Sequence, residues 1–571
     1  MFVGWCWVNC FHCRFESSGT AVGRPSTEQR DARRTCAMPD HDVSHLRDVI
    51  QDLLDKHMYS SAVFFADKLV ALADATPADV YLLAQAHFVA KHYRAAGSLL
   101  RAEGLVDADP RFKYLAARCA YEIGDMEGCI ETLGNDGTAV DTEMETSDEE
   151  EKGSVNVLAA METLRGRAYD ALDNRNAAKR CYADALRKDP YCYEAFEQLV
   201  ANHLMTVQEQ KQLLAELPFS KENRWLKLLY EVKAGRYAGH EELEARMTEL
   251  ECPRNETVGG RPGCGLSSNA DVLAARAEWL FYSGDFRKCY DITMEVMQSN
   301  PFEKVIVPIH LAVCVELKQK NELFLIGHRL VEEFPSSGLS WYAVGCYYLA
   351  AKMNDSARRY FSKATVLDSK FAPAWIGFGH AFAAQDESDQ AMAAYRTASR
   401  LFPGCHIPIM CIGMEYMRTN NLPLAEQLLL NAKSVCPLDP MIYNELGVLY
   451  FRNGDYNKAT RWLREALKVA PKPLAAMWEP ILVNLAHSLR KQGLYTEACI
   501  HYKDALALSC KSASTYAALG FTKHLQDNLP EAIEMYHKAL SLRPEDTLTA
   551  ELLNEALLED CSRHRNGGDL L

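Results

Sequence analysis

Cysteine and histidine side chains near the amino terminus have the residue types of a metal site. Cys10-Phe-His-Cys13, with Cys6 upstream, supplies half of a structural zinc site. Such a site usually needs a second pair of ligands at a suitable spacing, and only Cys36 follows nearby. The alternative is that residues 1–37 are a disordered extension, or translated upstream sequence with the true start at Met38, because amphipathic helical pattern begins only after that methionine.

The other residues with chemical potential fit packing better than catalysis. His380 has no partner at ligand spacing, and nothing evident activates the thiols of Cys346, Cys411 and Cys436. The sequence contains no Walker motif, metalloprotease motif, nucleophile elbow or kinase signature. We therefore expect a protein that is not an enzyme and that uses no cofactor or metal.

Composition narrows the class of protein. Lys and Arg number 62 and Asp and Glu number 77 in 571 residues, so the formal net charge is −15. This acidic balance disfavours nucleic acid as a partner, because phosphates need a basic face. No stretch approaches the ~18 apolar residues of a membrane span. The 19 scattered cysteines indicate buried thiols in a reducing compartment rather than a disulfide framework.

A 34-residue repeat organises most of the chain and would position any functional side chains. Gly345, Gly379, Gly413 and Gly447 follow one another at steps of 34, with alanines 12 and 19 residues after each glycine. A serine or proline stands 24 residues after each glycine. Further copies of this pattern begin at Gly166, Ala486 and Gly520.

This period is typical of the tetratricopeptide repeat, a pair of antiparallel helices. The recurrent glycine and alanine let the two helices approach closely, where a larger side chain would overpack the contact. Gly124-Asp125, Gly284-Asp285 and Gly454-Asp455 lie where a first helix must end. Each unit leaves an apolar face that only a neighbouring unit covers. We predict an all-α, superhelical solenoid of roughly thirteen helix–turn–helix repeats.

Shifts in composition mark the boundaries of the predicted solenoid. Residues 141–152 carry seven acids and one Lys, too polar to bury the surface that folding needs. We expect an extension over 1–37, repeats over 43–133, an acidic disordered loop over 134–156, repeats over 157–250, a flexible insertion over 251–269, repeats over 270–545, a capping helix over 546–560 and a tail over 561–571.

The first helices of the six C-terminal repeats are expected to line a concave groove. With the repeat glycine as position eight, positions two, five, nine and twelve face inward; none of these 24 residues is Lys, Asp or Glu, and Arg490 is the one formal charge. Such a groove suits an extended or helical peptide with apolar anchors, but not a chaperone's acidic tail, which needs lysines. Met410, Met414 and Met417 fit core packing and an adaptable contact surface equally well. The predicted groove residues are Tyr342, Cys346, Ile376, His380, Met410, Met414, Asn444, Val448, Val483, His487, Ala517 and Phe521.

Several stretches resemble one particular family of tetratricopeptide-repeat proteins. Trp341-Tyr-Ala-Val-Gly-Cys-Tyr-Tyr348, Ala374-Trp-Ile-Gly-Phe-Gly-His380 and Gly404-Cys-His-Ile-Pro408 are similar to the cell-division-cycle sixteen/Cut9 subunit of the anaphase-promoting complex, also called the cyclosome. The likeness extends from about Val43 to Asp560. The amino-terminal extension and the near absence of a long C-terminal tail depart from the family pattern.

The resemblance implies a non-catalytic scaffold subunit of a multi-subunit ubiquitin ligase that acts on cell-cycle regulators in mitosis. Family members homodimerise through their N-terminal repeats, which places the dimer surface within about 43–200 here. Their C-terminal groove holds the amino-terminal segment of a small partner subunit, along 340–525 in this chain, and they stack against related repeat subunits. We accordingly expect nuclear and cytoplasmic localisation with association to the spindle. A chaperone adaptor, or another peptide-binding scaffold, is the alternative that the solenoid leaves open.

Overall fold

The computed structural model describes residues 40–72, 76–134, 156–220, 223–235, 240–253, 257–258 and 261–567. The extension over 1–37 with its candidate zinc ligands, and all but the ends of the 134–156 loop, lie outside these residues. The chain separates into two compact units, Met1–Met144 and Glu145–Leu571. Each unit has hydrophobic clusters of its own.

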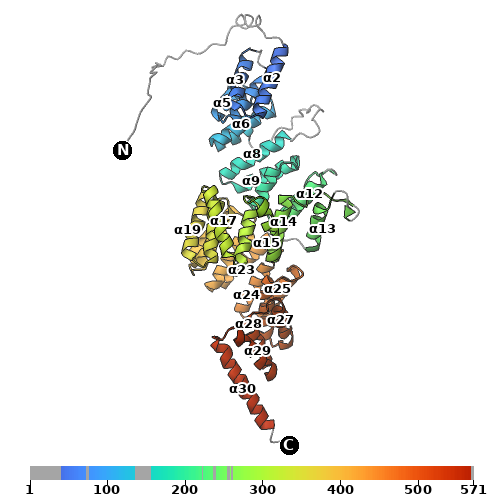
Figure 1. Ribbon diagram of the computed structural model, residues 1–571, viewed down its shortest axis with the longest axis vertical. Coiled ribbons are helices and arrows are strands. Elements are labelled where there is room, and N and C mark those ends of the chain that lie inside the picture. Colours follow the sequence, from blue (N-terminus) through green and yellow to red (C-terminus); the bar gives the residue numbers. More distant parts are fainter. Residues whose placement is uncertain are drawn as a thin grey trace, which may run out of the picture. The chain divides into compact units, whose positions relative to one another are not determined.

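The amino-terminal unit consists of helices that pack consecutively (Figure 1). Arg47 and Asp79 join two of its repeats through a bidentate pair, with Nε–Oδ1 at 2.6 Å and Nη2–Oδ2 at 2.8 Å. Asp79 also forms a capping box with Thr76, so this buried carboxylate caps one helix and ties it to another. The helices are α2 (Asp40–Asp55), α3 (Tyr59–Leu72), α4 (Pro77–Val89), α5 (Tyr93–Ala102), α6 (Pro110–Ile123) and α7 (Met126–Leu133).

The larger unit continues the pattern of paired helices (Figure 1). Its first part contains α8 (Val157–Ala171), α9 (Arg175–Lys188), α10 (Tyr193–Ala201), α11 (Val207–Glu216), α12 (Arg224–Ala234), α13 (His240–Glu251), α14 (Ala270–Ser283), α15 (Phe286–Ser299), α16 (Ile306–Glu316) and α17 (Lys320–Glu333). Its second part contains α18 (Gly338–Ala350), α19 (Asn354–Leu367), α20 (Ala372–Ala383), α21 (Ser388–Leu401), α22 (His406–Arg418), α23 (Leu422–Val435), α24 (Pro440–Arg452), α25 (Tyr456–Val469), the 3-10 turn η2 (Ala476–Trp478), α26 (Glu479–Lys491), α27 (Tyr495–Leu508), α28 (Ala513–Leu525), α29 (Leu529–Leu542) and α30 (Thr547–Gly567).

The turn within a repeat follows the chemistry expected from the sequence. Gly284 ends α14 in the left-handed region, with a φ of 86°, which costs glycine little and other residues more. The next residue, Asp285, accepts a hydrogen bond from the Lys288 backbone N–H and caps α15. Gly124 and Asp125 repeat this arrangement between α6 and α7.

The repeat glycine is the point at which the two helices of a unit touch. A Cβ added to Gly379 would lie 2.2 Å from Cε1 of Tyr395, and one added to Gly447 would lie 2.5 Å from Cγ of Leu463. The side chain 16 residues after the glycine therefore fills the space that a Cβ would need. The all-α tetratricopeptide solenoid and its phase are confirmed. The same contact joins Gly166 to Tyr182, Gly345 to Phe361, Gly413 to Leu429 and Gly520 to Tyr536.

The insertion predicted to be flexible over 251–269 is partly integrated into the fold. It contains a short antiparallel hairpin, β1 (Thr257–Val258) and β2 (Arg261–Pro262). Cys264 and Leu266, just after the hairpin, pack against the cluster formed by α12 to α16. The insertion therefore returns two apolar side chains to the core, a contact that its Gly- and Pro-rich composition does not reveal.

The closing helix is longer than the predicted 546–560. Helix α30 spans Thr547–Gly567, because no proline or glycine interrupts the chain before Gly567. Leu553 and Ala556 are buried against Tyr536, as a cap on the last repeat requires. Among the described residues, none of the helices is long and apolar enough to cross a bilayer.

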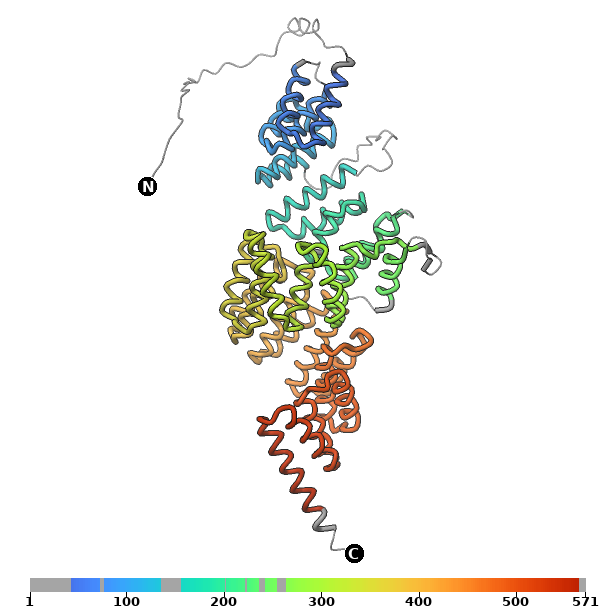
Figure 2. The backbone as a smooth tube through the Cα atoms, viewed as in Figure 1, coloured from blue at the N-terminus to red at the C-terminus, as the bar shows by residue number. Residues whose placement is uncertain are grey.

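Figure 2 shows the course of the chain through the larger unit. Within this unit, segments about 200 residues apart are bonded to one another. Asp170, whose side chain is 2% exposed, pairs with Arg175 and with Lys370. The Gly404 N–H donates to the carbonyl of His203 at 2.6 Å. A side chain at Gly404 would collide with this backbone, so the close approach needs glycine. These contacts join successive turns of the superhelix.

A second bridge between turns comes from the segment that connects α25 to α26. The indole Nε1 of Trp478 donates to the carbonyl of Ser283 at 3.1 Å. Trp478 is 2% exposed, and Met477 packs where a Cβ on Gly284 would lie. Ala486 follows Gly447 by 39 residues instead of 34, so five extra residues interrupt the repeat near 472–477. This insertion is the piece of chain that contacts the end of α14.

Candidate functional site

The candidate groove is lined by the first helices of the C-terminal repeats. Apart from consecutive helices, α16 contacts α18, α18 contacts α20, α22 contacts α24 and α24 contacts α26. These even-numbered helices are the first helices of their repeats, and the odd-numbered helices are the second ones. Among the described residues, no second helix contacts the second helix of the next repeat as extensively as these first helices contact each other. First helices therefore form the tighter, inner layer and second helices the outer one, as in a superhelix with a concave face.

The twelve predicted groove residues divide into accessible and buried sets. Tyr342, Cys346, Met410 and Asn444 are buried, with at most 8% of each residue exposed. The accessible wall consists of the other eight: His380 and Met414, which are exposed, and Ile376, Val448, Val483, His487, Ala517 and Phe521, which are half-buried.

Tyr342 and Cys346 belong to the core between repeats. The Tyr342 ring meets Phe371 edge-on, with centroids 5.1 Å apart. Burial raises the pKa of Cys346 to about 12, and burial likewise raises the pKa of Cys411 to about 12. Both thiols stay protonated at neutral pH, which agrees with packing roles rather than nucleophilic ones.

The methionine stripe serves both of the roles that its spacing allowed. Met410 and Met417 are buried in one core cluster with Leu446. Met414, on the same helix, is 37% exposed. A flexible thioether thus reaches the accessible wall at one position and fills the core at two.

Two histidines of the wall are held by tyrosines in the same way. His380 Nδ1 lies 2.8 Å from the hydroxyl of Tyr395, and His487 Nδ1 lies 2.6 Å from that of Tyr502. Both tyrosines are essentially inaccessible, and burial raises their pKa, for Tyr502 to about 12. His380 is exposed as a residue, but its ring is desolvated where it faces Tyr395, and this lowers its pKa. Burial together with the charge of Arg490 lowers the pKa of His487 to about 4. Both imidazoles are therefore neutral at physiological pH.

An asparagine pair, half of which the sequence reasoning missed, joins two of the inner helices. Asn484 Nδ2 donates to Asn444 Oδ1 at 2.9 Å, and Asn444 Nδ2 donates to Glu445 Oε1 at 3.0 Å. Burial raises the pKa of Glu445. The pairing of Asn484 with Asn444 depends on how α24 and α26 pack, which the single repeat pattern does not encode.

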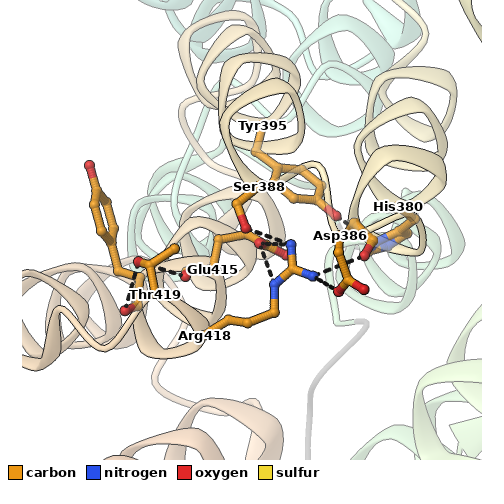
Figure 3. Close-up of polar contacts among 9 residues, drawn as sticks. His380, Asp386, Ser388, Tyr395, Glu415, Arg418 and Thr419 are labelled. Atoms are coloured by element: carbon orange, nitrogen blue, oxygen red, sulfur yellow. Dashed lines mark hydrogen bonds and ion pairs between the residues drawn. The ribbon is translucent and has the colours of Figure 1, made fainter.

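Arg418 locks the repeat that carries His380 to the next one (Figure 3). Its Nη2 donates to Ser388 Oγ at 2.6 Å and to Glu415 Oε2 at 2.7 Å. Its Nη1 pairs with Asp386 and donates to the carbonyl of Ala383 at 3.3 Å. Arg418 lies on α22, and its guanidinium donates hydrogen bonds to groups in and beside the turn between α20 and α21. These bonds hold that part of the wall in place.

Arg490, the one formal charge at the inner positions, stacks on an aromatic ring. Its guanidinium carbon lies 4.9 Å from the centroid of Phe521. It makes no ion pair with the described residues. The groove therefore keeps one cation that is stabilised by a ring rather than by an acid.

One cluster has metal-ligating residue types, although the sequence showed no ligand spacing. His310, Cys314 and Glu322 have ligand atoms within 4.8 Å of one another. His310 lies 2.8 Å from Thr293 through Nδ1 and 3.0 Å from Glu322 through Nε2. Tyr290 donates to the other Glu322 oxygen at 2.6 Å. The Thr293 hydroxyl also lies 2.9 Å from the carbonyl of Cys289, to which it donates, so its oxygen is free to accept from His310 Nδ1. The side chains of this cluster are thus bonded to one another and to the backbone.

Comparison with family models points to the same architecture and complex. A model of the anaphase-promoting complex, cyclosome, subunit 3 matches residues 55–136. Models of the tetratricopeptide repeat match residues 440–473 and 479–545. The matched segments lie in both units of the chain.

Whole-chain relatives are more specific. Anaphase-promoting complex subunit 6 of Arabidopsis thaliana is 44% identical over 545 residues, which cover 93% of this chain and 99% of that protein. The cell division cycle protein 16 homolog of Homo sapiens is 38% identical over 90% of this chain and 84% of its own length. The crystal structure of the APC/C hetero-tetramer Cut9–Hcn1 matches with a TM-score of 0.71 and 33% identity over 93% of this chain and 99% of that chain. This chain therefore belongs to the family of anaphase-promoting complex subunit 6, which includes Cdc16 and Cut9.

Proposed function

We propose that the chain is a non-catalytic scaffold of the anaphase-promoting complex, a ubiquitin ligase, and supports ubiquitination of cell-cycle regulators in mitosis. The observation that carries this proposal is the similarity to Cut9 and its relatives over nearly the whole chain. Its bonded superhelical turns suit a part that spaces other subunits. The protein would act in the nucleus and cytoplasm and associate with the spindle. Affinity purification from dividing cells tests this: other subunits of the ligase should co-elute, and their absence would contradict it.

The C-terminal groove is proposed to hold the amino-terminal segment of a small partner subunit. Cut9 forms a hetero-tetramer with Hcn1, and the accessible wall here carries mainly apolar and uncharged side chains. Purified protein should therefore gain thermal stability when saturated with recombinant Hcn1. A chaperone adaptor would instead bind peptides with a free C-terminal carboxylate, more tightly at low salt.

Homodimerisation is proposed through the amino-terminal unit. Phe64 and Phe65 on α3 are 57% and 38% exposed, an apolar pair suited to the core of an interface. Light scattering should give a dimer for the wild type and a monomer for the Phe64→Asp/Phe65→Asp variant. Phe324→Asp controls for the added charge, because Phe324 is 53% exposed on α17 in the other unit. A wild-type monomer at micromolar concentration would refute the dimer.

A further inference from the structure

The two histidines of the groove wall share one arrangement that other repeats lack. Each follows the repeat landmark directly, and each bonds to a tyrosine 15 residues later in its own repeat. Where Met414 or Val448 stands at the histidine position, Leu429 or Leu463 stands at the tyrosine position. Tyrosine also stands at this position as Tyr182 and Tyr536, where Arg167 and Phe521 take the histidine position. Each histidine is thus accompanied by a tyrosine, whereas a tyrosine does not require a histidine.

The hydrogen bond between His380 and Tyr395 has one direction. The Tyr395 hydroxyl is buried, and His380 Nδ1 is its sole hydrogen-bond partner in the described structure. If Nδ1 carried the proton, the hydroxyl hydrogen would be buried without an acceptor, which costs ~1–3 kcal/mol. The hydroxyl therefore donates to Nδ1, and a neutral imidazole must carry its proton on Nε2. Figure 3 shows the hydroxyl of Tyr395 directed at the ring of His380.

The Nε2 edges of both rings face the accessible wall. His380 is an exposed residue although its Nδ1 edge points at an inaccessible tyrosine. His487 Nε2 has no protein partner, and it is not among the described atoms that are buried without one. The ring of His380 therefore presents an N–H donor to whatever fills the groove. The same tautomer is inferred for His487 by its equivalent place, although Tyr502 also bonds to Thr522.

We infer that Tyr395 and Tyr502 fix His380 and His487 as Nε2–H tautomers, which donate to backbone carbonyl groups of the partner segment in the groove. The inference rests on the proposed function of that groove and names the chemistry it uses. The two donors come from α20 and α26, three repeats apart, so they hold an extended segment at two points. Uncharged donors suit peptide carbonyls, which occur in every sequence, and the apolar residues between them select side chains.

The test compares the same substitution at equivalent positions. Tyr395→Phe and Tyr502→Phe remove the hydroxyl that sets the tautomer and leave both histidines in place. Tyr536→Phe is the matched control, because its buried hydroxyl has no hydrogen-bond partner and Phe521 occupies the histidine position. Affinity for labelled recombinant Hcn1 should fall for each of the first two variants, at most by the ~10-fold that one hydrogen bond is worth, and stay unchanged for the control.

A second readout reports the tautomer itself. Nitrogen-15 spectra of histidine-labelled protein should show Nε2–H imidazoles at positions 380 and 487, and a mixture of tautomers after Tyr395→Phe. An Nδ1–H ring or an imidazolium in the wild type at pH 7 would overturn the inference. Equal affinities of the Tyr395→Phe and Tyr536→Phe proteins for Hcn1 would also overturn the inference. If wild-type protein shows the Nε2–H tautomers and does not bind Hcn1, the proposed partner and the role of these donors both fail.

Discussion

Adding one methyl group at Gly379 should disrupt the contact between α20 and α21. The new Cβ of Gly379→Ala would lie 2.2 Å from Cε1 and 2.7 Å from Cζ of Tyr395. The ring cannot simply move away, because Tyr395 is 1% exposed and its hydroxyl is bonded to His380. The helices must separate or the ring must shift. Ala486 opposite Tyr502 shows that a repeat adapted to a Cβ at this place keeps the bond to its histidine, so the cost at Gly379 comes from repacking a contact built for glycine.

The magnitude follows from three contributions. Overpacking of this kind costs ~1–3 kcal/mol, and distortion of the Tyr395–His380 hydrogen bond adds at most about 1 kcal/mol. Alanine in a helix interior returns ~0.5–1 kcal/mol relative to glycine. The net destabilisation should therefore be about 1–3 kcal/mol, concentrated in one repeat and its neighbours, because repeats interact mainly with adjacent repeats.

Native-state hydrogen exchange measures this locally, through the free energy of opening of α20 and α21. Gly327→Ala is the control, because a Cβ there meets Val344 at an ordinary 3.6 Å within α17; it should be neutral or stabilising. Equal stability of Gly379→Ala and Gly327→Ala would refute the reasoning.

Three further predictions concern contacts between and within turns. Asp170→Asn should destabilise the larger unit by about 3 kcal/mol, because it removes the charge that pairs with Arg175, whose side chain is 11% exposed. Lys370→Ala should cost less because Lys370 is 43% exposed; thermal unfolding of both variants checks the order. His406 is buried and its Nε2 lies 2.7 Å from Asp439; burial lowers its pKa, but the bonds to Asp439 and Cys436 outweigh this and raise the pKa to about 9. The stabilisation from this raised pKa is therefore complete below pH ~6.5 and lost as pH rises through about 9, so wild-type stability should fall over that window more steeply than that of His406→Gln. Trp478→Phe keeps an aromatic ring but removes the indole donor across the turn, and should cost ~1 kcal/mol; an unchanged melting temperature would mean that this bridge contributes nothing.

The repeat phase was predictable because its cause is local. Gly379 and Tyr395 are 16 residues apart, and their contact requires only that two helices turn back on each other. The sequence records this as a small residue at one place and a large one at another. The turn signal at Gly284-Asp285 is equally local, and both appeared as expected.

The accessible wall was only partly predictable. Position within a helix indicated which side faces inward, and His380, Met414 and Phe521 do keep access to solvent. Tyr342 and Asn444 are covered, because coverage depends on how closely successive first helices pack. The bonded pairing of each histidine with a tyrosine was present in the sequence as a recurring spacing of 15 residues, but its meaning required the ring orientations.

Sequence alone therefore determined the helical pair, its period and the family to which the chain belongs. The tertiary structure alone decided that Asp170 meets Lys370, that Gly404 meets His203 and that Trp478 reaches the end of α14. Each repeat adds a small rotation, and these rotations accumulate over several repeats before two turns meet. A pattern of 34 residues encodes the individual step, whereas contacts between turns depend on the sum of the steps.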